Sequence, residues 1–215
     1  MLSKAKKILI IDFDLENNNL YSVFGVNKIP KELKEKIKDE NFLEEFCLKE
    51  KNIQKLIIKV YKNLDIISCA DIIFGNKYLY KKEGIEEMLN ELKRQYELIF
   101  LDISRGIKNE KVTSVLLERS DKIVCLTGGN MLEIKKTISI LNDNQKDKIF
   151  IIYNKKNKYT MKTKIIELLL LKFKIIGTLD YDIRYNQIIN KNMNKLYISK
   201  KIRNEYIKIM EKLKI

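Results

Sequence analysis

The stretch Lys7-Ile8-Leu9-Ile10-Ile11-Asp12-Phe13-Asp14 contains the clearest fold signal in the chain. Its four consecutive apolar residues, three of them β-branched, predict a short strand buried on both faces, which is typical of a parallel sheet. The strand ends where the acids begin, because burying an unpaired charge is costly. Ligands bind at the carboxyl ends of strands in open parallel α/β sheets, so Asp12 and Asp14 are candidate site residues. The alternative is that both acids only cap the following turn.

Further apolar runs alternate with helical patterns along the 215 residues. This alternation predicts parallel βαβ units, and hence an α/β fold with a doubly wound, mainly parallel sheet and helices on both faces. Residues 28–63 are lysine-rich and helical in pattern. No linker, repeat or low-complexity tail indicates a second domain, so residues 1–215 are expected to form one. The other strands are expected at residues 64–69, 98–102, 123–126, 149–153 and 175–179.

Polar residues end most of these strands, and right-handed crossovers bring the carboxyl ends of parallel strands to one edge. The residues expected to meet there are Asp12, Asp14, Asp102, Thr127, Asn154 and Asp182. Carboxylates at a sheet edge suit Mg²⁺, which is usually shared with substrate phosphates. None of the seven glycines is followed by Lys and then Ser or Thr, so no P-loop motif is present. Gly128-Gly129 is expected to form a turn rather than an anion site.

The composition excludes several kinds of chemistry. Histidine is absent, which removes histidine-dependent triads and histidine-ligated metal sites. The three cysteines show no CxxC spacing and have apolar neighbours, so buried reduced thiols are expected. The basic start at Lys4, Lys6 and Lys7 is followed by only four apolar residues before Asp12, which is too short for a signal-peptide core, and no apolar run is long enough to span a membrane. The protein is therefore expected in the cytoplasm, with membrane association as an alternative.

Five blocks in series resemble the MinD/ParA-type ATPases, a group of P-loop NTPases. The block from Ile10 to Gly25 resembles the family's second conserved block, and the run from Tyr96 to Asp102 resembles its Walker B strand. The other three blocks are Ser120-Asp121-Lys122-Ile123-Val124, Ile151-Ile152-Tyr153-Asn154-Lys155 and Ile176-Gly177-Thr178-Leu179-Asp180-Tyr181-Asp182. Asp102 is followed by Ile-Ser-Arg rather than Thr-Pro-Pro, which favours the pilus-assembly branch of CpaE/TadZ-like proteins.

The resemblance implies an ATPase-like protein of intracellular positioning or pilus assembly. Asp12 and Asp14 would be the catalytic acids that order the Mg²⁺ shell and the attacking water, and Asp102 would hold Mg²⁺ through a water. Asn154 would contact adenine and Asp182 would lie beside the base, so ATP and Mg²⁺ are the implied cofactors. The family works as an ATP-sandwich homodimer whose state controls binding to DNA, a membrane or a polar partner, such as a pilus-assembly protein.

The chain departs from this family at its start. The family's first strand and Walker A loop lie upstream of Met1, and Met1-Leu2-Ser3-Lys4 is similar to the end of the helix that follows that loop. The sequence therefore represents either a truncated ATPase or a degenerate paralogue without the phosphate loop. The remaining blocks are intact, which favours truncation. In both cases ATP binding or hydrolysis by this chain is expected to be weak or lost.

A receiver-like phosphoacceptor domain is an alternative function. Asp12, Asp102, Thr127 and Lys155 provide the acids, the threonine and the lysine of such a domain. Asp12 and Asp102 lie too far apart in the chain for one βαβ unit plus a strand, and the first acids are separated rather than adjacent. The spacing therefore disfavours this alternative.

A non-catalytic binding module is the third possibility. Residues 191–215 carry eight basic and two acidic residues, and the chain has a net charge of +14. Ile202, Tyr206, Ile209 and Leu213 form one apolar stripe, so a helix here can lie on an anionic membrane or face nucleic acid. A final helix that docks on the sheet and exposes its lysines explains the same pattern and is preferred.

Overall fold

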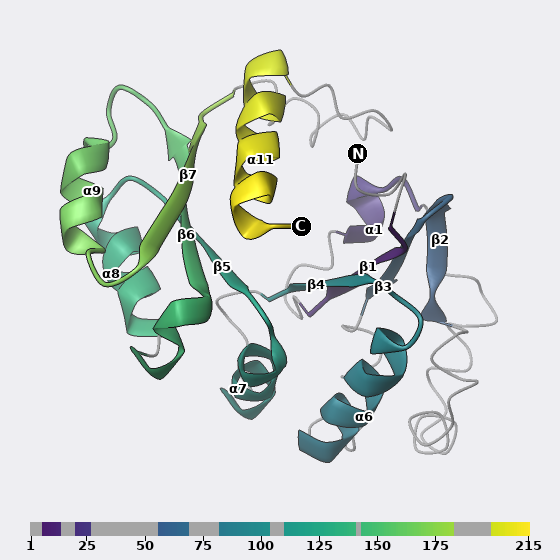
Figure 1. Cartoon of the computed structure of the whole chain (residues 1–215). Coiled ribbons are helices and arrows are strands. Elements are labelled where there is room, and N and C mark those ends of the chain that lie inside the picture. Colours follow the sequence, from purple (N-terminus) through teal and green to yellow (C-terminus); the bar gives the residue numbers. More distant parts are fainter. Residues whose placement is uncertain are drawn as a thin grey trace. The chain divides into compact units, whose positions relative to one another are not determined.

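The computed structural model describes residues 6–13, 20–26, 56–68, 82–103, 110–140, 143–182 and 199–215. The chain divides into two compact units, Met1–Arg119 and Ser120–Ile215. Each unit contains its own β-sheet with helices packed against it (Figure 1). Among the residues that the structure describes, all strand pairs but one are parallel, so the predicted mainly parallel α/β fold is confirmed.

The first unit is built on a four-stranded sheet with the order β2-β3-β1-β4. The central β1 runs parallel to β3 and β4, whereas β2 runs antiparallel to β3. The apolar run before Asp12 forms the predicted strand, and β4 has the predicted limits. The strands are β1 (Ile8–Asp12), β2 (Ile58–Tyr61), β3 (Leu64–Ser68) and β4 (Leu98–Asp102).

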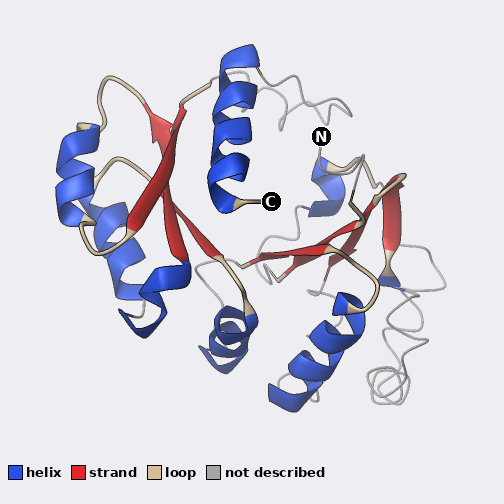
Figure 2. Cartoon of the chain, viewed as in Figure 1, coloured by secondary structure: helices blue, strands red, loops and turns tan. Residues whose placement is uncertain are grey.

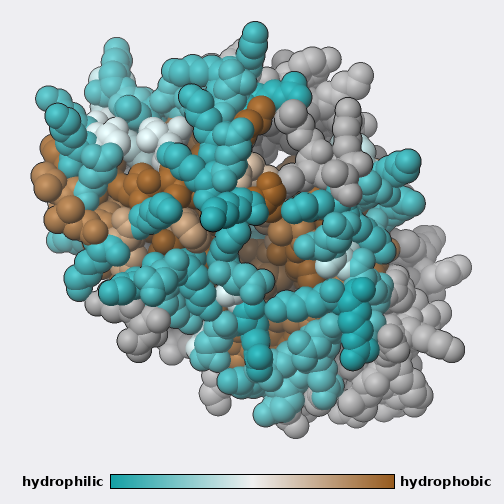
Figure 3. Space-filling view, viewed as in Figure 1, coloured by the Kyte–Doolittle hydropathy of each residue, from teal (hydrophilic) through white to brown (hydrophobic). Residues whose placement is uncertain are grey.

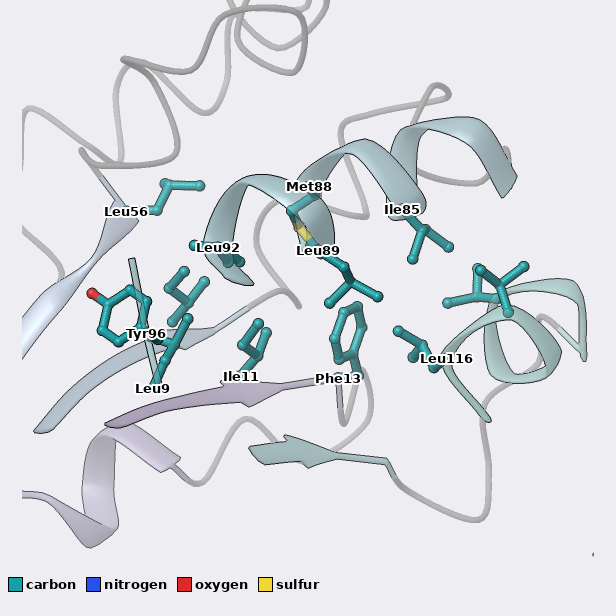
Figure 4. Packing of buried hydrophobic residues seen from close by; sticks show 13 residues of the cluster. Leu9, Ile11, Phe13, Leu56, Ile85, Met88, Leu89, Leu92, Tyr96 and Leu116 are labelled. Carbon is teal, nitrogen blue, oxygen red and sulfur yellow. The ribbon is translucent and has the colours of Figure 1, made fainter. Parts of the chain in front are cut away.

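The core of this unit lies between the sheet and the amphipathic helix α6 (Lys82–Lys93). Leu9 and Ile11 of β1, and Phe13 directly after it, alternate along the chain and all point toward α6 (Figure 4). Helix α7 (Glu110–Arg119) adds Leu116 to the same cluster and is tied to α6 by an ion pair, with Arg119 Nη2 2.6 Å from Glu86 Oε1. Because odd-numbered residues of β1 enter this core, Asp12 must project to the opposite face.

The helical prediction for residues 28–63 is wrong at its C-terminal end, because residues 58–61 form β2. Half-buried Ile58 and Val60 alternate with exposed Lys59 and Tyr61, which is the two-residue period of a strand. The β-branched residues favour a strand, and Lys62-Asn63 makes the short turn that pairs β2 with β3. Residues 28–55 lie outside the described part of the chain.

The second unit is built on the parallel sheet β5-β6-β7. Helix α11 (Lys200–Leu213) packs on β7, while α8 (Met131–Ile140) and α9 (Thr163–Leu169) lie on the other face of this sheet (Figure 2). Ile209 and Leu213 of α11 join a buried cluster with Ile152, Ile176 and Leu179. The remaining elements are β5 (Ile123–Thr127), the 3₁₀ helix η3 (Asp143–Lys148), β6 (Ile149–Lys156) and β7 (Lys174–Asp180).

The predicted final helix is confirmed, and the C-terminal half of its apolar stripe packs on the sheet, whereas Tyr206 of the same stripe is exposed. Ile209 and Leu213 are buried, and the helix begins after Ser199, whose Oγ accepts a hydrogen bond from the Ile202 N–H at 3.3 Å. None of the helices in the described residues is both long and apolar enough to cross a membrane. Cys125, which was expected to be buried, is half-buried; Cys47 and Cys69 lie outside the described residues.

Candidate functional site

Three polar residues end neighbouring strands at the carboxyl edge of the first sheet. Asp12 is aligned with Ser68 on β3 and with Asp102 on β4. Residues aligned in parallel strands project to the same face of the sheet, so these side chains lie side by side. Asp12 is only 1% exposed, whereas Asp102 is exposed. Asp12, Ser68 and Asp102 are called the polar edge below.

Ser68 contributes to the polar edge a hydroxyl that is available to donate a hydrogen bond. Its side chain is 3% exposed, and its Oγ has no hydrogen-bond partner among the described residues. The Ser68 N–H donates to the hydroxyl of Tyr21 at 3.3 Å, which joins the end of β3 to α1 (Leu20–Val23). A buried hydroxyl without a partner costs about 1–3 kcal/mol, so a bound ligand that accepts its hydrogen bond removes a penalty.

Ser68 and Tyr21 were not predicted as site residues from the sequence. Ser68 ends an apolar strand as Asp12 and Asp102 do, and this pattern is the signal that was available. Asp14, the second predicted catalytic acid, lies outside the described residues. Among the residues described, no three Asp, Glu, Cys or His side chains form a group that can hold a metal ion.

The predicted base-contacting residues lie at the carboxyl edge of the second sheet. Asn154 is a half-buried residue of β6, and its Oδ1 accepts a hydrogen bond from the Lys155 N–H at 2.9 Å. Asp182 follows the end of β7, and β7 is held beside β6 there because Lys156 is aligned with Asp180. The hydrogen bond and charge of Asp180 raise the pKa of Lys201, which ties α11 to the end of β7.

Side chains of the second unit fill the space around the loop that follows β5. Thr127 is fully buried and its Oγ1 lies 3.1 Å from Thr137 Oγ1. The Glu133 carboxylate fills the space beside Gly128, because a Cβ at Gly128 would lie 1.4 Å from Glu133 Oε2. Asn130 Oδ1 accepts from the Glu133 N–H at 2.9 Å, which caps the start of α8. Gly128-Gly129 thus forms a turn with a negative charge against it, which disfavours a phosphate there.

The structure brings the candidate residues together in two groups. Asp12 and Asp102 share the polar edge of the first unit, and Asn154 and Asp182 share the corresponding edge of the second. In both units the residues lie at the carboxyl ends of parallel strands, where ligands bind in open α/β sheets.

No protein-family model and no curated protein sequence matches the chain. Solved structures do match it. The MinC:MinD cell division protein complex of Aquifex aeolicus has a TM-score of 0.74 at 18% identity, covering 99% of this chain and 85% of that chain. A putative plasmid partition protein of Borrelia burgdorferi B31 bound to AMPPNP has a TM-score of 0.73 at 24% identity, covering 100% and 89%.

The septum site-determining protein MinD of Pyrococcus horikoshii OT3, in complex with Mg-ADP, matches with a TM-score of 0.71 at 17% identity. That alignment covers 99% of this chain and 85% of the other. At these identities the likeness is one of fold. The chain therefore has the fold of the MinD/ParA-type ATPases.

Proposed function

We propose that the chain is a nucleotide-dependent positioning protein of the MinD/ParA kind, and that its polar edge lies beside the metal-bound phosphates. The observation that carries this proposal is the alignment of buried Asp12 with exposed Asp102 at the carboxyl edge of a sheet of this fold. The similar structures from P. horikoshii and B. burgdorferi contain Mg-ADP and AMPPNP, respectively.

The side chains of the polar edge fit Mg²⁺, because two carboxylates and a hydroxyl offer only oxygen ligands. Asp102 is proposed to hold the ion through a water, since its side chain is exposed. Asp12 and Asp14 are proposed to orient the attacking water and to fix the metal shell. When bound, Mg²⁺ neutralises the charge that develops on the phosphate oxygens.

Asn154 and Asp182 are proposed to contact the base. The Asn154 amide nitrogen can donate a hydrogen bond, because Oδ1 is the atom that accepts from the Lys155 N–H. The bond to the Lys155 N–H also fixes the direction of the carboxamide. Asn154 lies on β6 and Asp182 lies just after the end of the neighbouring strand β7, which supports a shared role.

ATP binding and hydrolysis by these 215 residues are proposed to be weak or lost. The sequence contains no Gly-Lys-Ser/Thr loop, and the Gly128-Gly129 turn has the Glu133 carboxylate against it. The cradle of backbone amides that holds phosphates in P-loop proteins is therefore provided neither by such a loop nor by the Gly128-Gly129 turn.

For the biological role we propose pilus assembly, because Asp102-Ile103-Ser104-Arg105 favours the CpaE/TadZ-like branch. The proposed assembly is a homodimer that binds a pilus-assembly or polar protein. One similar structure, from A. aeolicus, is a complex of MinD with MinC. Light scattering with and without Mg²⁺-ATP tests the homodimer. The expected molecular mass of the homodimer is twice the chain mass of 25.6 kDa.

Titration with a fluorescent ATP analogue tests the nucleotide site. We expect weak binding that requires Mg²⁺ and that Asp102→Asn reduces by about tenfold, a loss of about 1.4 kcal/mol. Asp121→Asn is the matched control, because Asp121 is also an exposed acid next to a strand but lies outside the polar edge. Binding that persists in EDTA, or that both variants reduce equally, contradicts the proposal.

A further inference from the structure

The second unit exposes an apolar surface on residues 155–174, which run from the end of β6 through α9 to β7. Tyr159 is 85% exposed, Leu168 is 65% exposed and Leu171 is 76% exposed. Hydrophobic surface is visible over α9 at the left of Figure 3, with hydrophilic surface around it. Residues 155–174 are called the α9 segment below.

The exposed residues of the α9 segment are not its packing residues. Ile166 and Leu170 are buried against the unit, whereas Ile165 and Leu168 lie three positions apart on another face of α9. Surface helices normally carry polar residues on the face away from the core. Contiguous exposed apolar side chains mark an interaction surface instead.

The apolar surface extends onto the first turn of α8. The Met161 N–H donates to the Gly129 carbonyl at 3.0 Å, so the loop before α9 lies against the start of α8. Leu132, in that first turn, is 63% exposed. Exposed apolar groups of two neighbouring elements therefore belong to one region of the second unit.

The α9 segment is also strongly basic. It contains seven lysines and a single acid, Glu167, and all seven lysines are exposed. The lysines both precede and follow α9, so cationic groups flank the exposed leucines on each side. Long lysine side chains can lie along an apolar surface and keep their ammonium groups in a polar layer.

We propose that the α9 segment docks on an anionic lipid bilayer. Tyr159, Leu168 and Leu171 enter the interface between headgroups and acyl chains, and the lysines contact lipid phosphates. Charge complementarity selects this occupant, because a second copy of the segment would bring two strongly cationic surfaces together. The phosphates of a nucleic acid can pair with the lysines, but a nucleic acid provides no apolar environment for the leucines. The inference is independent of nucleotide binding.

Flotation of the whole chain with vesicles tests the proposal. We expect binding to vesicles of phosphatidylcholine with phosphatidylglycerol, much weaker binding to pure phosphatidylcholine, and a decrease as salt is raised. Lys158→Glu with Lys164→Glu should lower the partition coefficient at least about tenfold, because each lysine near an anionic surface contributes about 1 kcal/mol. Leu168→Ser should lower it by several-fold.

Two matched controls separate this surface from general charge and hydrophobicity. Lys200→Glu with Lys208→Glu makes the same charge change at exposed positions of α11, and Val23→Ser removes a 46% exposed apolar residue of α1. Both controls should bind as the wild type does, with unchanged circular dichroism in all variants. Absence of binding to the anionic vesicles overturns the proposal. Loss of binding in the α11 variant alone also overturns it and assigns the interface to α11.

Discussion

Asp12 and Asp102 end neighbouring parallel strands at the same level, but the Asp12 carboxylate is buried and the Asp102 carboxylate is exposed. Loss of the two side chains should therefore have different consequences for stability. We expect Asp12→Ala to lower the free energy of unfolding by about 1–3 kcal/mol, because removing this buried side chain leaves a cavity and ends its polar interaction. Asp102→Ala should change it by no more than about 0.5 kcal/mol. Urea unfolding followed by circular dichroism measures both, and equal losses would contradict the assignment.

Ser68→Ala should stabilise the protein. Its buried hydroxyl has no partner among the described residues, so removing it should raise the free energy of unfolding by about 1 kcal/mol. Thr137→Ala is the control, because the Thr137 hydroxyl is also buried but lies 2.9 Å from the Glu133 carbonyl. Thermal unfolding should give a higher Tm for the first variant and a lower Tm for the second. A lower Tm for both would show that Ser68 has a structural partner.

Tyr96 should make stability depend on alkaline pH. Its hydroxyl donates to Asp65 Oδ2 at 2.7 Å, and burial together with this hydrogen bond and the Asp65 charge raises its pKa well above the usual value. Above pH about 10 the unfolded chain loses the Tyr96 proton while the folded chain keeps it, so stability falls as pH rises.

Tyr96→Phe should remove that part of the pH dependence and cost about 1 kcal/mol at neutral pH. Tyr159→Phe, at an 85% exposed position, should keep the wild-type profile. Urea unfolding at a series of pH values from 8 to about 11 provides the comparison. An unchanged alkaline slope in Tyr96→Phe would rule out the Tyr96–Asp65 contact as its source.

Gly177 allows α11 to lie close to β7. A Cβ at this position would be 2.4 Å from Ile209 Cγ1, so Gly177→Ala should destabilise the protein by about 1–3 kcal/mol through overpacking. Combining it with Ile209→Ala removes the clash, and the double variant should lose less stability than the sum of the single losses by at least about 0.5 kcal/mol. Strict additivity in unfolding experiments would exclude this contact.

Much of the fold could be predicted because its strands are short apolar runs with polar ends. The limits of β4 were predicted correctly from Leu98 to Asp102, since a buried parallel strand leaves a continuous apolar run. The antiparallel strand β2 was missed. Ile57 and Val60 also fit a helical face, and only the pairing of β2 with β3 resolves the ambiguity.

The candidate site was only partly predictable. Asp12 and Asp102 could be identified because each follows an apolar run, but their unequal burial depends on what packs on each strand end. Ser68 and Tyr21 are joined by a contact between residues 47 positions apart, and no local pattern signals such a contact. The strand register, not the sequence, places Ser68 beside Asp12.

Paramagnetic broadening by Mn²⁺ added with ATP shows directly whether the polar edge binds a nucleotide-bound metal. Mn²⁺ takes oxygen ligands as Mg²⁺ does, and it broadens the resonances of nearby amides. The proposal predicts that the amide signals of Phe13, Ser68 and Ile103 broaden first, and that Asp102→Asn suppresses this effect while Asp121→Asn does not. Broadening centred on other surface acids, or equal broadening in Asp102→Asn, would contradict a metal–nucleotide site at the polar edge.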